Sequence, residues 1–318
     1  MEEGAKGKDK VGLPATYKKM AQIDALIADR MSQRGLAFIP EIKTEDGLLV
    51  GAAIHDTTED APLWDQMDLA KSKWALRNRP KLEAVLIARK ELFNYKAHKP
   101  PFTKPDGTPF EVKIELINDT PAVTRAWRLA PEKLKVLDKH IDTLLESKVI
   151  YPTDDSNYSA VTVLVKKPGR TNELRVTTDY RKLNHKCKKY AFMTPTASEL
   201  FNMTAGATTF STIDVHSAFY AMQVRKADQH KLAFSTPHRG MFTYNRMPQG
   251  WINSPQCWAA GCQKMLMAKY DGPGPMNGRP CHEFCAQFVD DLLIYSTDEY
   301  HLDYIAFILK LLEKHNLS

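Results

Sequence analysis

Residues 288–296, FVDDLLIYS, place two adjacent aspartates inside an apolar segment. A buried carboxylate is costly unless it is paired or bound to a cation, so this pair needs an explanation. The flanking residues predict two short strands, 286–289 and 292–296, joined in a β-hairpin whose two-residue turn is Asp290 and Asp291. Such a hairpin buries its strands and leaves both acids at the edge of a sheet. By itself, a pair of aspartates in a turn is more often a solvated turn than a catalytic site.

A third acid strengthens the catalytic interpretation. Asp214 ends the β-branched run FSTID, where an unpaired carboxylate would again be costly. If a strand at 209–214 lies beside the hairpin in one antiparallel sheet, Asp214 and Asp290 face each other at one end of it. Carboxylates that converge there repel unless divalent cations neutralise them. Mg²⁺ accepts one or two carboxylates together with substrate phosphates, and a pair of such ions suits phosphoryl transfer.

A local concentration of basic residues predicts a polyanionic partner. Between Val165 and Tyr190 the sequence has nine basic and two acidic residues, a local net charge of +7, although the whole chain carries only +6. Such a patch suits nucleic acid or nucleotide phosphates, although a solvated lysine-rich surface would look the same on charge alone. The basic residues are Lys166, Lys167, Arg170, Arg175, Arg181, Lys182, Lys186, Lys188 and Lys189.

The bulk composition is that of an ordinary globular protein. Hydrophobic residues make up 43% of the 318 residues and charged residues 26%. No run of 18 or more apolar residues occurs, so we expect no membrane partner. The first ten residues lack the apolar core of a secretory signal. The five cysteines, an odd number without framework spacing, favour an intracellular, cytoplasmic location.

The order of the predicted elements indicates an α+β fold in two parts. Residues 1–97 contain segments with helical spacing but no chemical motif, and we interpret them as a partly helical N-terminal extension or linker. The Pro- and Gly-rich stretch 98–110 marks a boundary. Beyond it, strands and helices mix without regular βαβ alternation. The predicted elements are a strand at 111–117, a helix at 130–150, a hairpin at 159–180, a short helix from Thr196, a strand at 209–214 followed by a turn and a helical segment, short strands within 231–236 and 241–247, and helices at 252–270 and 301–318.

Four segments resemble, in order, the fingers and palm of a reverse transcriptase. They are residues 163–184, 210–224, 231–258 and 288–296, of which DYRKLN, IDVHSAFY, MPQG and FVDD are the most specific parts. The resemblance is to the enzymes of gypsy-type LTR retrotransposons and of retroviruses, and it covers about residues 100–318. It implies a right-hand polymerase fold, in which an antiparallel palm sheet is flanked by helices and preceded by the N-terminal extension.

The resemblance implies that three carboxylates are catalytic. Asp214 would be the first metal-binding carboxylate, assisted by the main-chain carbonyl of Val215, and Asp290 would be the second. Asp291 would complete the acidic cluster. Phe288 stands where the family more often has tyrosine before the Asp-Asp turn. The implied cofactor is a pair of Mg²⁺ ions, with Mn²⁺ as an alternative.

The resemblance also implies a site for the incoming deoxynucleotide. Phe219 would lie beneath the sugar and exclude a ribose 2′-hydroxyl, with Ala218 as a flat surface beside it. Chemistry alone does not rank Phe219 above its neighbour Tyr220. Gln249 would contact the nucleotide, and because many gypsy-type elements have phenylalanine there, this chain resembles the retroviral form.

Basic residues of the predicted hairpin would bind the triphosphate. Arg175 would stack on the base and touch the triphosphate, since a guanidinium is planar, permanently charged and has several donors. Lys166 or Lys167 would meet the β- and γ-phosphates, and the flexible turn at 168–172 leaves the choice between them open.

Three further residues would serve the nucleic acid. Asp179 and Arg181 would orient the hairpin and contact the template strand, and Gly250 would let the backbone approach the template and primer closely. The implied partners are an RNA or DNA template with its primer, deoxynucleoside triphosphates and other modules of the same polyprotein. A retroelement particle is a further implied location.

The sequence leaves two functions open. The first is the RNA-directed DNA polymerase core of a retroelement polyprotein, which adds deoxynucleotides to a primer 3′-end by two-metal phosphoryl transfer. The second is a truncated or co-opted remnant that binds nucleic acid or a partner without synthesis. The chain stops at Ser318, so we interpret residues 98–318 as fingers and palm truncated before the primer grip, thumb and ribonuclease H. Phe219 and the pairing of DYRKLN with MPQG argue against an RNA-dependent RNA polymerase.

Overall fold

The computed structural model describes residues 67, 69, 72–93, 99–167, 170–288, 291–297 and 299–317. Most of the predicted N-terminal extension, the side chain of Lys167 and the predicted metal ligand Asp290 lie outside the described residues. The described residues form the α+β fold that the sequence predicts. None of their helices combines the length and hydropathy that crossing a bilayer requires.

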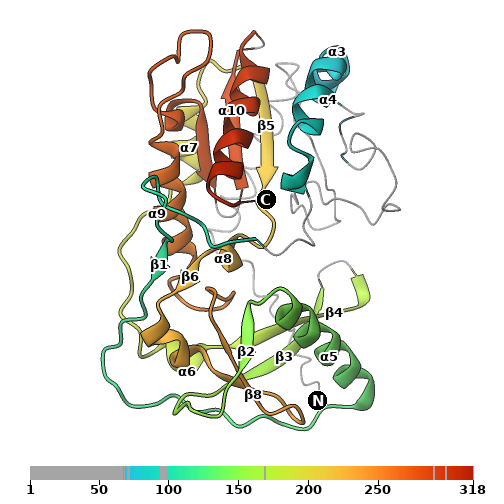
Figure 1. Ribbon diagram of the computed structural model, residues 1–318, viewed down its shortest axis with the longest axis vertical. Helices are drawn as coiled ribbons and strands as arrows, with labels where there is room; N and C mark the ends of the chain where they lie inside the picture. Colours follow the sequence, from blue (N-terminus) through green and yellow to red (C-terminus); the bar gives the residue numbers. More distant parts are fainter. Residues whose placement is uncertain are drawn as a thin grey trace, which may run out of the picture.

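Two sheets divide the structure into two lobes, which we name by the family resemblance (Figure 1). The fingers sheet has the strand order β2-β8-β7-β3-β4, and the palm sheet has the order β5-β10-β9. All neighbouring strands in both sheets are antiparallel except β3 and β7. A short parallel pair, β1 and β6, lies between the lobes (Figure 1). The strands are β1 Glu111–Val112, β2 Ile150–Pro152, β3 Ala160–Lys167, β4 Arg170–Asp179, β5 Thr209–Asp214, β6 Gln223–Val224, β7 Phe234–Ser235, β8 Met241–Tyr244, β9 Cys285–Phe288 and β10 Asp291–Ser296.

Helices pack on both sheets. In the fingers, α5 lies against β2 and β4; in the palm, α10 lies against β5 and β10, and α9 against β9. The α-helices are α3 Lys73–Arg77, α4 Arg79–Ile87, α5 Pro131–Glu146, α6 Arg181–Asn184, α7 Ala197–Met203, α8 Ala218–Ala221, α9 Ser254–Leu266 and α10 His301–Lys314. The 3₁₀ helices are η1 Lys90–Phe93, η2 Lys226–Leu232 and η3 Cys281–Glu283.

Apolar spacing explains the longer helices. In α5, Leu137, Ile141 and Leu144 recur at helical intervals and are buried, as the sequence predicts. They belong to the same hydrophobic cluster as Ile308 of α10, so one core runs through both lobes. A smaller cluster, which includes Phe210 of the palm sheet, lies apart from it.

Local capping explains where α7 begins. The side chain of Thr196 accepts a hydrogen bond from the backbone N–H of Glu199, and the carboxylate of Glu199 accepts one from the backbone of Thr196. This reciprocal capping box satisfies donors that would otherwise be unpaired at the start of the helix. The predicted start near Thr196 is confirmed.

The predicted strand at 111–117 is confirmed only in part. Its burial alternates as expected, with Val112 and Ile114 buried, but only Glu111–Val112 forms a ladder. The cause is the partner, because β6 is itself only two residues long. Beyond it, an isolated bridge between Leu116 and Cys187 and a side-chain network at Ile114 hold the segment.

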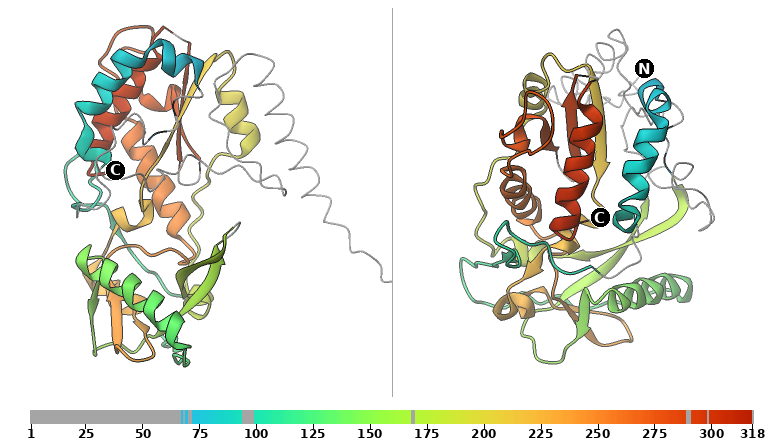
Figure 2. Two further views of the ribbon diagram at one scale, coloured as in Figure 1. Left: turned by 90° about the vertical axis from the view of Figure 1, so that its right-hand side faces the viewer. Right: turned by 45° about the horizontal axis from the view of Figure 1, so that its top comes forward.

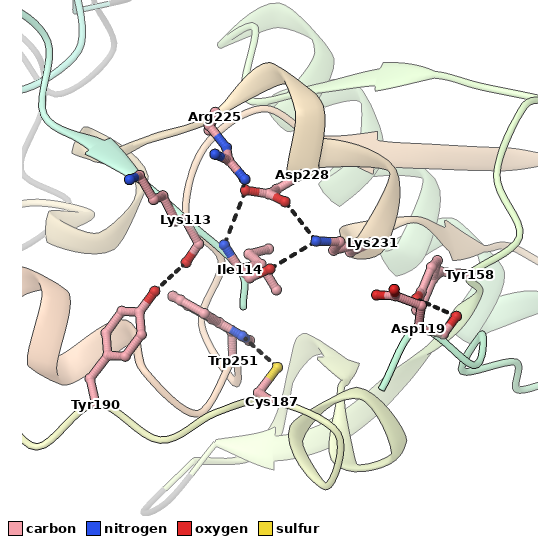
Figure 3. A network of polar contacts seen from close by, with 10 residues as sticks. All are labelled: Lys113, Ile114, Asp119, Tyr158, Cys187, Tyr190, Arg225, Asp228, Lys231 and Trp251. Atoms are coloured by element: carbon pink, nitrogen blue, oxygen red, sulfur yellow. Dashed lines mark hydrogen bonds and ion pairs between the residues drawn. The ribbon is translucent and has the colours of Figure 1, made fainter. Parts of the chain in front are cut away.

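A buried ionic network around Asp228 holds this segment at Ile114 (Figure 3). The carboxylate of Asp228, 1% exposed, accepts hydrogen bonds from Arg225 at 2.9 Å, from Lys231 at 2.6 Å and from the backbone N–H of Ile114 at 3.2 Å. Lys231 also donates to the carbonyl of Ile114 at 2.8 Å. Burial alone would raise the pKa of Asp228, but these donors lower it below its usual value, so the carboxylate stays ionised. The network fixes residue 114 to η2 between the lobes.

The chain before the Pro-rich stretch also packs on the palm. Among residues 72–93, five are buried and belong to the main hydrophobic cluster. They are Trp74, Ala75, Leu82, Leu86 and Leu92. The predicted boundary at residue 97 follows the composition of the sequence, but the core of the protein extends across it.

Candidate active site

Two predicted catalytic carboxylates lie opposite each other at one end of the palm sheet. Asp214 ends β5, Asp291 begins β10, and the two residues are register partners. Cβ atoms of directly opposed residues in an antiparallel pair are about 4.5–5.5 Å apart, and like charges there are destabilising. Asp214 is exposed and Asp291 is half-buried. The end of this sheet is therefore a place where a cation is stabilising.

Asp291 belongs to a strand, where the sequence predicts it in the hairpin turn. It pairs with Phe288 and is the first residue of β10. The register follows from burial, because Leu292 and Ile294 are completely buried and a slip of one residue would turn them to the other face. The partner of Asp214 is therefore Asp291, where the sequence predicts Asp290. The role of Asp290 stays a prediction, since it lies outside the described residues.

The donor set fits a magnesium site that a nucleotide helps to complete. Mg²⁺ keeps several waters and binds through one or two carboxylates and substrate phosphates, without needing a full protein cage. In the part of the chain that the structure describes, no group of three or more His, Cys, Asp or Glu side chains could hold a metal ion. The two opposed carboxylates, with the adjoining main-chain carbonyl of Val215, match this partial ligand set.

A strained turn carries the chain from the carboxylate strand into the predicted nucleotide site. Ser217 has φ +50°, a left-handed conformation that is uncommon for residues other than glycine. This turn begins α8, so that Ala218 and Phe219 follow Asp214 closely. Backbone strain of this kind persists where the surrounding structure holds it, and it is frequent at functional sites.

The packing separates the roles of Phe219 and Tyr220. The ring of Tyr220 stacks on that of Tyr244, with centroids 6.0 Å apart and planes at 17°. Burial raises the pKa of the Tyr220 hydroxyl well above its usual value. Tyr220 therefore has a structural partner in the fingers sheet, whereas Phe219 is half-buried and has no such stacking partner among the described residues.

The structure brings Arg175 and Gln249 together. Arg175 is exposed on β4, and its guanidinium donates a hydrogen bond to the side-chain carbonyl of Gln249. Lys166 is not brought to the same place. Arg175 is the register partner of Val165, and Lys166 pairs with Leu174, so Lys166 lies on the opposite face of the hairpin.

Asp179 and Arg181 form a pair with each other. The Arg181 guanidinium donates to both carboxylate oxygens of Asp179, with N–O distances of 2.7–3.1 Å. These hydrogen bonds lower the pKa of Asp179 below its usual value. The Arg181 side chain is 83% exposed, so one side of its guanidinium is open to solvent.

Gly250 is required by the protein's own backbone. It has φ +92°, and a Cβ atom placed there would lie 3.2 Å from the carbonyl oxygen of Thr178. The turn that follows Gln249 thus packs tightly against β4. Asn184 strengthens this contact by donating to the Gly250 carbonyl at 2.8 Å.

Arg246, for which no sequence motif predicts a role, links the two predicted nucleotide-binding segments. It is 8% exposed, and its guanidinium donates to the carbonyls of Ala221, at 3.3 Å, and Lys99, at 3.2 Å. Burial lowers the pKa of Arg246, and none of the described carboxylates forms an ion pair with it. Ala221 ends α8, and Arg246 directly precedes the segment that contains Gln249. A single buried cation thus ties both segments together.

We expect Arg246→Met to lower the free energy of unfolding by about 1–3 kcal/mol, because two buried carbonyls lose their donors. It should also raise the KM for deoxynucleotides, since α8 and the Gln249 segment lose their common tie. Urea unfolding and primer-extension kinetics measure the two effects. Arg246→Lys keeps the charge but not the paired donors of the guanidinium. Its free energy of unfolding and its KM should lie between those of the wild type and of Arg246→Met. A loss of stability with an unchanged KM would show that Arg246 only supports the core.

Comparison with known proteins agrees with this arrangement. Residues 165–318 match the family described as reverse transcriptase (RNA-dependent DNA polymerase). The Tf2-3 and Tf2-4 transposon polyproteins of Schizosaccharomyces pombe are each 31% identical to the chain over 212 residues, which is 66% of this chain and 15% of the polyprotein. The chain thus spans only about 15% of the length of these relatives.

The fold has counterparts among solved structures. The foamy viral protease-reverse transcriptase in complex with an RNA/DNA hybrid superposes with a TM-score of 0.60 at 20% sequence identity, covering 76% of this chain and 30% of that one. The native prototype foamy virus enzyme gives a TM-score of 0.59 at 18% identity. This likeness confirms the predicted fingers-and-palm architecture. The family match places residues 165–318 in the reverse transcriptase family, and the retrotransposon polyproteins are similar to the chain over a longer stretch.

Proposed function

We propose that this chain is the RNA-directed DNA polymerase core of a retroelement polyprotein. In this reaction deoxynucleotides are added to a primer 3′-end by phosphoryl transfer that depends on divalent metal. The observation that carries the proposal is the direct opposition of Asp214 and Asp291 at the end of the palm sheet. Two opposed carboxylates destabilise a sheet unless a cation joins them, and a triphosphate arrives with such a cation.

The residues of the site divide the work. Asp214, Asp291 and the predicted ligand Asp290 would hold two Mg²⁺ ions, with Mn²⁺ as an alternative. Bound there, the ions would supply an activated primer hydroxyl and neutralise charge on the leaving phosphate. The chain's own contribution is positioning, because the β5-β10 register fixes the carboxylates relative to one another.

The nucleotide would be held on the side of the fingers. Arg175 would bind the base and triphosphate, and Gln249 would orient the guanidinium through the hydrogen bond that joins them. Of the two lysines, Lys167 is the better candidate for the β- and γ-phosphates, because Lys166 lies on the other face from Arg175. Phe219, supported by Ala218, would exclude a ribose.

We propose an RNA or DNA template with its primer as the nucleic-acid partner. Arg181, oriented by Asp179, offers an exposed guanidinium for a template phosphate. Gly250 would contribute backbone close to the strand. The relatives are polyproteins, so other modules of one polyprotein, within an intracellular retroelement particle, are the proposed surroundings.

Primer extension on poly(rA)/oligo(dT) with Mg²⁺ or Mn²⁺ tests the proposal. We expect the purified chain to extend the primer and Asp290→Asn to abolish extension without loss of substrate binding. Binding of the primer-template by the wild-type chain without any extension would favour the alternative, a remnant that binds nucleic acid.

Replacement of Phe219 should change the choice of sugar. We expect Phe219→Ala or Phe219→Val to relax discrimination against ribonucleotides by roughly 10- to 100-fold, since removal of buried bulk beside a substrate changes selectivity on this scale. The ratio of kcat/KM for dTTP and UTP measures the effect. Tyr220→Phe is the matched control, because it keeps the ring that stacks on Tyr244 and should keep the ratio. Unchanged selectivity in an active Phe219 variant would exclude this residue as the sugar gate.

A further inference from the structure

We propose that residues 72–93 are a working part of the palm: a brace that packs on α10 and, through Trp74 and His301, holds the two carboxylate-bearing strands in register. The brace consists of α3, α4 and η1, which run alongside α10 (Figures 1 and 2). It precedes residue 98, where the sequence predicts the polymerase to begin, and residue 165, where the family match begins. Only the kinetic part of its test rests on the proposed function.

The brace is attached through apolar side chains. Trp74 is 6% exposed, Leu82 4%, Leu86 6% and Leu92 5%, and all four belong to the main hydrophobic cluster. Both α4 and η1 contact α10 directly. Leu76 on α3 and Ile87 on α4 point to solvent, being 49% and 62% exposed. Each helix of the brace therefore has one face that is part of the palm core and one that is not.

His301 joins the two strands beneath the brace. It is the first residue of α10 and is completely buried. Its Nε2 atom lies 2.8 Å from the hydroxyl oxygen of Ser211, and its Nδ1 atom lies 2.7 Å from that of Ser296. Ser211 belongs to the strand that ends at Asp214, and Ser296 to the strand that begins at Asp291. One imidazole ring thus bridges both carboxylate-bearing strands.

Trp74 packs against the His301 ring that forms this bridge. Its indole meets the His301 ring edge to face, with centroids 5.0 Å apart and planes at 87°. The indole N–H has no hydrogen-bond partner among the described residues, so the contact is one of packing. Burial lowers the pKa of His301 to about 4, which keeps the ring neutral at pH 7. A neutral ring can donate from one nitrogen and accept at the other, and a serine hydroxyl can take either role.

This bridge joins the two strands that carry, at one end, the register partners Asp214 and Asp291. The brace and His301 act on the same two strands away from that end. Since small displacements of catalytic groups reduce rates strongly, a support that keeps the register has a direct effect on turnover.

Hydrogen exchange of the full chain tests the brace without relying on activity. The test variants are Trp74→Ala and Leu86→Ala, and the matched controls are Leu76→Ala and Ile87→Ala on the exposed faces of the same helices. We expect both test variants to speed exchange at least tenfold in peptides spanning 209–214 and 291–296. Exchange in the fingers strands, 160–167 and 241–244, should stay unchanged, and so should all peptides of the controls.

Primer extension adds the kinetic part of the test. Trp74→Ala should lower kcat several-fold with little change in the KM for deoxynucleotides, and Trp74→Phe should restore most of the loss by keeping an aromatic edge on His301. Unchanged exchange in the palm strands, or an equal rise in the palm and fingers strands, would overturn the proposal. If the wild-type chain extends no primer, the proposed polymerase function fails, while the exchange data still decide whether the brace supports the strands.

Discussion

Asp214→Asn should abolish primer extension and at the same time stabilise the metal-free protein. Loss of a metal-binding carboxylate removes several kcal/mol of transition-state stabilisation, which corresponds to a rate loss of roughly 10³-fold or more. Without divalent metal, the same change removes a like charge directly opposite Asp291. Relief of such a cross-strand repulsion contributes about 0.2–1 kcal/mol to the free energy of unfolding. Urea unfolding in EDTA measures this gain.

Added Mg²⁺ separates the metal site from a general effect on the fold. Wild-type protein should become more stable as Mg²⁺ is added, because the ion binds the folded state, and Asp214→Asn should respond less. Thr212→Ser is the control. Thr212 is exposed on the same face of β5 as Asp214, two residues earlier, and it pairs with Leu293. It should retain both activity and the response to Mg²⁺. An active Asp214→Asn protein would place the metal ligands elsewhere.

Arg175→Met should raise the KM for deoxynucleotides roughly 10- to 100-fold with a smaller effect on kcat. Hydrogen bonds to charged groups contribute about 1.5–3 kcal/mol, and each 1.4 kcal/mol is a factor of ten in affinity. Arg175→Lys should recover only part of the loss, because an ammonium group can neither stack on a base nor bind two oxygens in a fork. Steady-state kinetics with a single deoxynucleotide measure the effect.

The hydrogen bond between Arg175 and Gln249 makes this prediction specific. Gln249→Ala should raise the KM as well, and the double variant should be less impaired than the sum of the two, since the glutamine acts partly through the guanidinium. Lys189→Met is the control for charge, because Lys189 is exposed in the same basic patch. It should weaken primer-template binding but leave the nucleotide KM unchanged. Additive effects of Arg175 and Gln249 would contradict their pairing.

Much of this fold could be predicted from periodicity alone. The helix that contains Leu137 and Ile141 and the hairpin that contains Arg175 follow from apolar spacing and turn residues, and both are confirmed. Asp214 stood out as a carboxylate at the end of a β-branched strand. The prediction that Asp291 lies in the hairpin turn was wrong, since two adjacent aspartates do not show which of them begins a strand. Burial of Leu292 and Ile294 decides it.

Other features depend on contacts between distant parts of the sequence. Arg246 donates to carbonyls of Lys99 and Ala221, and backbone acceptors leave no trace in a sequence. His301 lies far along the chain from Ser211 and Trp74, and a lone histidine at the start of an amphipathic helix predicts no bridge. The roles of such residues can be recognised only from the three-dimensional arrangement of the strands.

The order of strands in the fingers sheet has a consequence for how the protein is made. Strands β2, β3 and β4 come from residues 150–179, but β7 and β8, which complete the sheet between β2 and β3, come from residues 234–244. The palm strand β5 is synthesised in between. During synthesis, the fingers sheet therefore cannot be completed until residue 244 has left the ribosome. By then the first strand of the palm sheet, β5, has already been synthesised. Neither lobe is a contiguous stretch of sequence that could be cut out or exchanged as one segment, so folding of both depends on long-range pairings.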